Sequence, residues 1–175
     1  ALGYRYGSYT SPHILHFNER VRISSVPVSA VELVEAFEQV EAARRDVSLS
    51  YFEFSTLAAF RILSDAGLDY AVMEVGLGGR LDAVNLLDAD CAVITPIGLD
   101  HQEYLGDDLE SIGREKAGIV RAGRPLVCGE PDPPCSVLET ASRLEAPVLL
   151  LGKDFAAEPE DDHTRFRLGQ LELRL

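Results

Sequence analysis

The spacing of apolar residues predicts a helix in the first quarter of the chain. Leu33, Phe37 and Val40 recur at the interval that brings side chains onto one face of a helix. Ser29 precedes this stripe and Glu32 lies three residues after Ser29, which is the capping-box pattern of a helix N-terminus. The sequence therefore predicts a helix that begins at Ser29 and buries one stripe.

The segment from Ser50 to Gly67 predicts a second helix of a different character. Ser50 and Glu53 repeat the capping box, and Gly67 is a typical stop after a helix C-terminus. The residues between them, YFEFSTLAAFRILSDAG, are apolar on almost every side. A helix of this kind is expected to be buried all round.

Short apolar runs predict strands, and further helices are expected between them. Asp107 with Glu110 opens one such helix, which ends at Gly118, and residues 135–145 form another. The second and third of the strand-like runs are apolar enough to be covered on both faces. The runs are 4–10, 69–75, 90–97, 125–129 and 147–152.

Strands that alternate with helices predict an α/β fold, in which a mostly parallel sheet is flanked by helices on both faces. Residues 165–175 alternate in polarity on either side of Gly169, which predicts a C-terminal β-hairpin. At 175 residues, the chain is expected to form a single domain, residues 1–175. Sites in such sheets form beyond the carboxyl ends of the strands.

The composition restricts the partners of this fold. A net charge of −13 argues against nucleic acid and against an anionic membrane surface, and no apolar run is long enough to span a bilayer. Some of the acidity is local, as in 153–163, which is expected to be a solvated loop. Cys91 and Cys128 lie in strand-like runs and are expected to be buried free thiols, which suits a reducing cytoplasm.

A glycine-rich loop follows the run at 69–75. Its residues 76–81 lack the third glycine of a dinucleotide fingerprint, and no helical pattern follows at once. The sequence pattern of a phosphate-binding P-loop is absent from the whole chain. The loop is therefore expected to bring its backbone close to a ligand, with Arg80 and Asp82 beside it.

Glu74 stands directly before this loop, at the end of an apolar strand. A buried carboxylate needs a partner, so Glu74 either pairs with Arg80 or a backbone amine, or binds a cation. Asp100 and His101 follow the next strand, which is expected to be adjacent and to place them close to Glu74. Mg²⁺ prefers oxygen ligands, with an occasional imidazole. The local sequence leaves these alternatives open.

Lys116 stands out because only Lys116 and Lys153 are lysines among the 16 basic residues. Unlike arginine, a buried lysine can lose its proton, and the neutral amine can then react with CO₂ to form a carbamate. The other interpretation is an ordinary lysine at a helix end.

Weaker candidates lie in the polar segment after the first strand. Ser11 and His13 have no triad spacing with other residues. Glu19, Arg20 and Arg22 form a charged cluster that either binds an anion or is a solvated strand face.

Five segments together resemble the dihydrofolate synthase/folylpolyglutamate synthase family of the Mur ligase superfamily, in particular its bacterial bifunctional form. They are, in order, YTSPHILHFNERVRI, LSYFEF, MEVGLGGRLDAVN, ITPIGLDHQEYLG and REKAGIV. The resemblance covers residues 3–150. It implies the P-loop-NTPase-like central domain of a Mur ligase, here without its P-loop.

The resemblance also implies a reaction. In this family a substrate carboxylate takes the γ-phosphate of ATP to form an acyl phosphate, and the amine of L-glutamate then attacks it to form an amide. The acceptor is dihydropteroate, the glutamate tail of a reduced folate, or both. Phosphoryl transfer of this kind requires positioning and neutralisation of charge by Mg²⁺. A cytoplasmic monomer is expected.

Roles for four residues follow from the matching motifs. Glu74 and His101 would ligate one Mg²⁺ near the γ-phosphate, and Ser11 would ligate another. Lys116, fifteen residues after His101, matches the family's carbamylated lysine, which acts beside the metal. His101 and Lys116 are therefore the expected catalytic residues.

The resemblance also has implications for the acceptor site and for the segments that flank this part of the sequence in the family. Asp82 matches a position near the pterin, and Arg80 is expected to bind substrate beside it. The family usually has threonine where this chain has Val84, so one hydroxyl is missing there. The family's P-loop is expected just before Ala1 and its C-terminal domain after Leu175. The chain by itself is therefore expected to be inactive.

Three other functions remain open on the sequence. One is another Mur-type amide ligase, which YFEF and GGRLDA disfavour, and another is a non-catalytic module that binds pterin or folate. Glu74, Asp100 and His101 alone are also compatible with a metal-dependent hydrolase, although this leaves the spacing to Lys116 unexplained.

Overall fold

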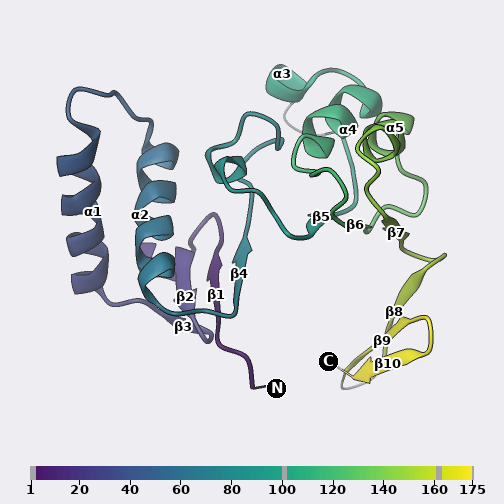
Figure 1. Cartoon of the computed structure of the whole chain (residues 1–175), viewed down its shortest axis with the longest axis horizontal. Helices are drawn as coiled ribbons and strands as arrows, with labels where there is room; N and C mark the ends of the chain where they lie inside the picture. The colour runs from purple at the N-terminus through teal and green to yellow at the C-terminus, as the bar shows by residue number, and fades with distance from the viewer. Residues whose placement is uncertain (1–2, 100–101, 161–162, 175) are drawn as a thin grey trace. The chain divides into compact units, whose positions relative to one another are not determined.

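The computed structural model describes residues 3–99, 102–160 and 163–174 (Figure 1). The chain forms two compact units, each with its own sheet, helices and core. The first is Ala1–Leu77 with Asp82–Leu86, and the second is Gly78–Leu81 with Leu87–Leu175.

The first unit contains a four-stranded sheet and two long helices. Its elements are β1 (Tyr6–Tyr9), the 3-10 helix η1 (Phe17–Arg20), β2 (Val21–Ile23), β3 (Val26–Pro27), α1 (Ala30–Arg44), α2 (Tyr51–Asp65), β4 (Tyr70–Met73) and the 3-10 helix η2 (Ala83–Leu86). The strand order is β3-β2-β1-β4, in which β1 and β4 run parallel and the other neighbours antiparallel. Helices α1 and α2 lie side by side (Figure 1).

Both predicted capping boxes are confirmed. Oγ of Ser29 accepts a hydrogen bond from the Glu32 N–H, and the Glu32 carboxylate accepts one from the Ser29 N–H. Ser50 and Glu53 make the same reciprocal pair at the start of α2. Gly67 follows the end of α2 with a φ of +59°, the left-handed conformation expected of a glycine stop.

The core of the first unit joins β1 and β2 to one face of each helix. The predicted stripe of α1 is confirmed, since Leu33 and Val40 are buried and Phe37 packs against them. Complete burial of α2 is wrong: Tyr51 in its first turn is 63% exposed, because the sheet and α1 cover only part of the helix surface. The buried cluster comprises Tyr9, Val21, Val28, Leu33, Ala59, Leu63 and Val84.

The second unit is a parallel three-stranded sheet with two helices of nine residues and a separate C-terminal sheet. Its elements are β5 (Ala92–Ile94), α3 (Gln102–Leu105), α4 (Leu109–Ala117), β6 (Leu126–Cys128), α5 (Cys135–Arg143), β7 (Val148–Leu150), β8 (Phe155–Pro159), β9 (Thr164–Leu168) and β10 (Leu171–Arg174). Strands β5, β6 and β7 are parallel neighbours in that order. Ile94, Ala117, Leu126 and Val137 are among the residues of their common core with α4 and α5.

The start of α4 differs from the prediction. Asp108, and not Asp107, is the N-cap, and its carboxylate accepts the Ser111 N–H at 2.7 Å. Glu110 instead reaches α5, where its two carboxylate oxygens accept the N–H groups of Cys135 and Ser136, each at 2.8 Å. These donors belong to the otherwise unpaired first turn of α5, so Glu110 fixes the start of one helix from the start of another.

The C-terminal hairpin is confirmed, with β9 and β10 antiparallel and Gly169 at a φ of +57° in the turn. Strand β8 pairs with β9 to make a third strand. The acidic stretch 153–163 therefore contains a strand, and its prediction as a solvated loop is wrong. Ion pairs across these strands, such as Arg167 with Glu158, accommodate the charges.

The α/β class is confirmed, but three details of the predicted sheet are wrong. Strands β4 and β5 lie in different sheets, because β4 pairs with β1 and β5 with β6. Neither strand is covered on both faces, since Val72 and Val93 are each 60% exposed. Cys128 is buried as expected, whereas Cys91 is exposed. None of the helices among the described residues is long and apolar enough to cross a membrane.

Candidate functional site

The carboxyl ends of the parallel strands β1 and β4 bring two predicted site residues together. The pairing continues one residue past β4, where the Glu74 N–H donates to the Tyr9 carbonyl at 2.9 Å. Beyond that point the Ser11 N–H donates to Oε2 of Glu74 at 2.7 Å. A backbone amine is thus the partner of Glu74, and Arg80 pairs elsewhere.

The Glu74 carboxylate is exposed, not buried as its position after an apolar strand suggested. Within the described ranges, no group donates a hydrogen bond to its second oxygen, Oε1. Ser11 is half-buried, and its hydroxyl belongs to the same short segment. A hydroxyl and a carboxylate, on segments joined by the Ser11–Glu74 hydrogen bond, are ligand types that suit a hard cation such as Mg²⁺, which keeps several water ligands.

The remaining predicted metal ligand, His101, lies outside the described residues, and so does Asp100. The part of the chain that the structure describes contains no cluster of three His, Cys, Asp or Glu side chains able to hold a metal ion. Of the predicted metal ligands, Ser11 and Glu74 are the two that the structure describes.

Asp82 organises the glycine-rich loop from within. Its Oδ2 accepts the N–H groups of Gly76 and Leu77, both at 3.1 Å, and its Oδ1 accepts the Val84 N–H at 2.9 Å. The bond to Val84 spans two residues, as in an Asx turn, and this local pattern is a signal that sequence reasoning missed. The carboxylate holds both ends of the loop in place.

Close approach of the loop backbone, expected toward a ligand, is observed here toward a side chain. A Cβ added to Gly76 would lie 2.5 Å from the ring of Phe52, so a larger residue there would require the Phe52 side chain to move. Phe52 itself is half-buried and packs against the core of the first unit. The loop conformation is thus fixed by Phe52 on one side and Asp82 on the other.

Arg80 docks on the end of α4 within the second unit. Its N–H donates to the Glu115 carbonyl at 2.9 Å, and its guanidinium pairs with the Glu115 carboxylate, also at 2.9 Å. A cation near a helix C-terminus also interacts favourably with the partial negative charge there. Arg80 is half-exposed, with 53% of its side chain accessible.

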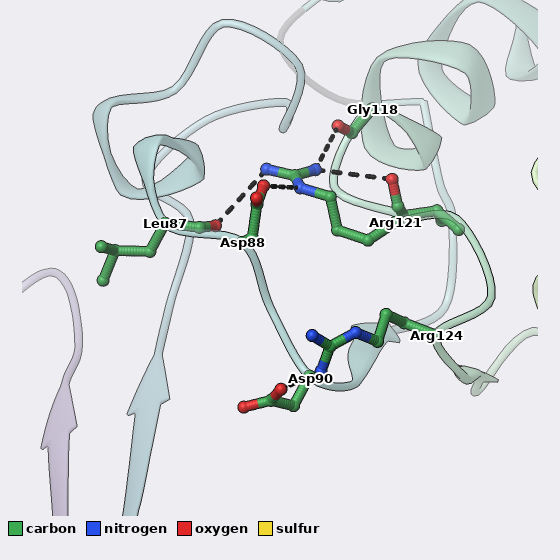
Figure 2. A network of polar contacts seen from close by, with 7 residues as sticks. Leu87, Asp88, Asp90, Gly118, Arg121 and Arg124 are labelled. Carbon is green, nitrogen blue, oxygen red and sulfur yellow. Dashed lines mark hydrogen bonds and ion pairs between the residues drawn. The ribbon is translucent and has the colours of Figure 1, made fainter.

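Lys116 lies in the last turn of α4 and is half-buried. The backbone around it is anchored, because Arg121 donates to the Gly118 and Val120 carbonyls and also binds Asp88 and the Leu87 carbonyl (Figure 2). In the described ranges, no side chain forms an ion pair or hydrogen bond with the Lys116 ammonium. The helix end that carries Lys116 is therefore fixed.

The charged cluster after the first strand divides into different environments. Arg20 is only 8% exposed, so the solvated-face interpretation is wrong for it. Its Nε donates to Nδ1 of His13 at 2.9 Å. Arg22 bonds backbone carbonyls of its own hairpin and has no part in this contact.

Glu19 shapes the segment between Ser11 and η1. Its carboxylate accepts the N–H groups of Ile14, Leu15 and His16 at 2.9, 3.0 and 2.7 Å. The bonds from Ile14, His16 and Leu15 lower the pKa of Glu19 to about 2. A single carboxylate thus orders the loop that carries Ser11 and His13.

More than half of the chain matches one known class of domain. Residues 50–160 match the family model described as Mur ligase middle domain, and the chain belongs to this family. No further assignment follows from the family match alone.

Individual similar proteins have more specific descriptions than the family model does. The chain is similar to the dihydrofolate synthase/folylpolyglutamate synthase of Escherichia coli (strain K12), with 49% identity over 141 residues that cover 81% of this chain and 33% of the relative. The protein of the same description from Buchnera aphidicola subsp. Acyrthosiphon pisum is 42% identical over 171 residues, 98% of this chain and 42% of the relative. The chain therefore spans between a third and about two fifths of the length of these curated relatives.

The chain is also similar to solved structures of proteins with the same kind of description. E. coli FolC in complex with DHPP and ADP superposes with a TM-score of 0.91 at 43% identity, covering 98% of this chain and 41% of that chain. The Yersinia pestis bifunctional folylpolyglutamate synthase/dihydrofolate synthase with Mn, AMPPNP and L-glutamate bound gives a TM-score of 0.88 at 47% identity, covering 98% and 42%.

Proposed function

We propose that this chain is the middle-domain part of a longer ATP-dependent ligase that joins L-glutamate to dihydropteroate, to the glutamate tail of reduced folates, or to both. The contact between Ser11 and Glu74 beyond the carboxyl ends of β1 and β4 is the observation that carries the proposal. Sites of α/β proteins form at this edge. The similar enzymes, with ADP, DHPP, AMPPNP, Mn or L-glutamate bound in their solved structures, indicate the ligands.

In this proposal the hydroxyl of Ser11 and the free Oε1 of Glu74 would hold Mg²⁺, together with His101. Bound Mg²⁺ would neutralise charge on the transferring phosphoryl group. The hydrogen bond from the Ser11 N–H to Oε2 supports this role, because it orients the carboxylate and leaves one oxygen for a cation.

Lys116 is proposed to act as a carbamate beside that metal, with His101 as the other catalytic residue. Its place at an anchored helix end supports this, since the position of the amine is then set by the backbone. Asp82 and Arg80 are the proposed substrate-binding residues. The hydrogen bonds that Asp82 accepts support a site at the glycine-rich loop, because they keep the loop in one conformation for the pterin.

The cellular setting follows from the reaction. We propose a cytoplasmic monomer whose partners are ATP, L-glutamate and dihydropteroate or a reduced folate. A net charge of −13 supports the absence of nucleic acid and of anionic membranes from this set.

The test is an assay of the full-length protein that contains this sequence, with ATP, Mg²⁺ and L-glutamate and with either dihydropteroate or tetrahydrofolate. We expect phosphate release that depends on both the acid and L-glutamate. Glu74→Gln should lower kcat by roughly 100-fold, because it keeps an acceptor for Ser11 but loses the negative charge. Asp90→Asn, at an exposed ion pair with Arg124, is the matched control and should change kcat little.

Other results of this assay would indicate other functions. ATP use with a different acid would indicate another Mur-type ligase, and phosphate release without L-glutamate would indicate a hydrolase. Binding of dihydropteroate without turnover by the wild-type protein would indicate a non-catalytic module. Unchanged kcat in Glu74→Gln would refute the metal-binding role.

A further inference from the structure

Arg20 is a buried cation without a carboxylate partner among the described residues. It is 8% exposed, and its guanidinium lies over the rings of Phe17 and Tyr51, 5.5 and 5.7 Å from their centroids. Burial raises the pKa of the fully buried Tyr9 hydroxyl, and the nearby Arg20 cation acts to lower it. The two aromatic rings and the hydrogen bond to His13 hold this guanidinium in one orientation. Its position is therefore set by the core of the first unit.

That fixed orientation determines the hydrogen-bonding state of His13. Arg20 has no acceptor atom, so its Nε can only donate, and Nδ1 of His13 at 2.9 Å must accept. With its lone pair at Nδ1 engaged, the imidazole carries its proton at Nε2. His13 therefore presents a hydrogen-bond donor on the side of the ring that faces away from Arg20.

The Nε2–H of His13 is a donor that the fold itself does not use. None of the described residues accepts a hydrogen bond from it, and it is not among the buried atoms that lack a partner. The ring lies 5.7 Å from that of Phe17, centroid to centroid. His13 follows Ser11 by two residues on the loop that Glu19 orders.

We infer that His13 is a ligand-binding residue whose Nε2–H donates to an anionic oxygen of a substrate, either the carboxylate of the acid or a phosphoryl oxygen of the nucleotide. Arg20 is its positioning residue. The inference rests on the proposed ligase function, because that function supplies substrates of this chemistry next to Ser11 and Glu74.

The buried positive charge of Arg20 favours a bound anion beside His13. A buried cation lowers the free energy of a nearby negative charge far more than an exposed one does, since water screens it less. Two carboxylates of the first unit are already occupied: Glu19 by three backbone N–H groups and Asp82 by three others. A substrate oxyanion would provide the negative charge with which no described carboxylate supplies Arg20.

Two substitutions separate this role from a purely structural one. In His13→Asn the amide oxygen occupies the position of Nδ1 and still accepts from Arg20, but no donor reaches the position of Nε2. In His13→Gln the longer side chain places an amide donor near the position of Nε2. We expect His13→Asn to lower kcat/KM of the full-length protein about 10- to 100-fold and His13→Gln to stay within about fivefold of wild type.

The kinetic constants show which substrate carries the oxygen that accepts the hydrogen bond from His13. A rise in KM for dihydropteroate or tetrahydrofolate places His13 on the acid, and a rise in KM for ATP places it on the nucleotide. Arg20→Lys, which loses the planar guanidinium, should show the same kinetic defect as His13→Asn, since the donor is then no longer oriented. Near-wild-type kinetics in His13→Asn, or equal losses in both His13 variants, would overturn the inference.

A second measurement does not depend on turnover. The ¹⁵N resonance of His13 Nε2 in the full-length protein should shift on addition of dihydropteroate or of ADP with Mg²⁺, while that of Nδ1 stays nearly constant. No shift with either probe would refute the role of His13, whatever the enzyme catalyses. Failure of the wild-type protein to form an amide would refute the proposed function instead.

Discussion

At the scale of the residue, the charge of Glu19 makes the stability of the loop after β1 depend on pH. Its pKa in the folded chain, about 2, lies below the ordinary value of 4.5, because three backbone N–H groups bind the charged form. A lowered pKa stabilises the fold above pH 4.5, and this contribution is lost as the pH falls from 4.5 to about 2. We expect the loop to open in that range.

Amide hydrogen exchange measures this opening directly. The protection factors of Ile14, Leu15 and His16 should fall between pH 4.5 and 2 before those of β1 do. In Glu19→Gln these amides should already be weakly protected at neutral pH, and protection should vary little across the window. Equal protection in the variant and the wild type would show that the carboxylate does not hold the loop.

For individual residues, only part of the candidate site could be predicted from the sequence. The motifs pointed to Ser11, Glu74 and Asp82, and the structure places Ser11 against Glu74 and Asp82 within its own loop. The environment of Arg20 was not predictable, because burial of a charged residue depends on rings contributed from distant positions such as Tyr51. Which group pairs with which is decided by tertiary contacts.

At the scale of the element, the contact between α4 and α5 depends on a glycine. A Cβ on Gly113 would lie 2.7 Å from Oγ of Ser136 and 2.9 Å from Cβ of Pro134. Gly113→Ala gains up to about 1 kcal/mol of helix propensity, but overpacking at a rigid contact costs about 1–3 kcal/mol. We expect a net destabilisation of about 1–2 kcal/mol in urea unfolding.

Gly98→Ala is the matched control for this prediction. A Cβ there meets no atom of the described residues within 4 Å, so the stability should change by less than about 0.5 kcal/mol. The prediction fails if Gly113→Ala is as stable as wild type, because the helices would then separate without cost.

Helix ends show why some elements were predictable and others were not. The capping boxes of α1 and α2 use partners three residues apart, so the sequence contains the whole interaction. Glu110 has the same local spacing, yet its carboxylate binds the N-terminus of α5, twenty-five residues further along. A short-range pattern cannot exclude a long-range partner of better geometry.

At the scale of the whole molecule, the alternation of strands and helices was sufficient for the α/β class, and the C-terminal hairpin was visible from its polarity. Strand neighbours were not, because β4 and β5 follow one another in sequence but pair with β1 and β6. Burial of Val72 and Val93 was overestimated for a related reason. An apolar run shows that a strand favours burial and does not show what covers each face.

The intact mass of the natural protein tests whether the proposed function belongs to this molecule. The chain spans only 33% and 42% of two curated relatives, so a ligase of this kind should have a mass well above 19.1 kDa. A mass of 19.1 kDa would refute the proposal that the chain is part of a longer enzyme. Recorded at neutral pH in bicarbonate, the same spectrum should show the added mass of one CO₂, which Lys116→Ala should lack. Its absence from the wild type would contradict the carbamate, while the metal-binding role of Glu74 would still be decided by the kinetics of Glu74→Gln.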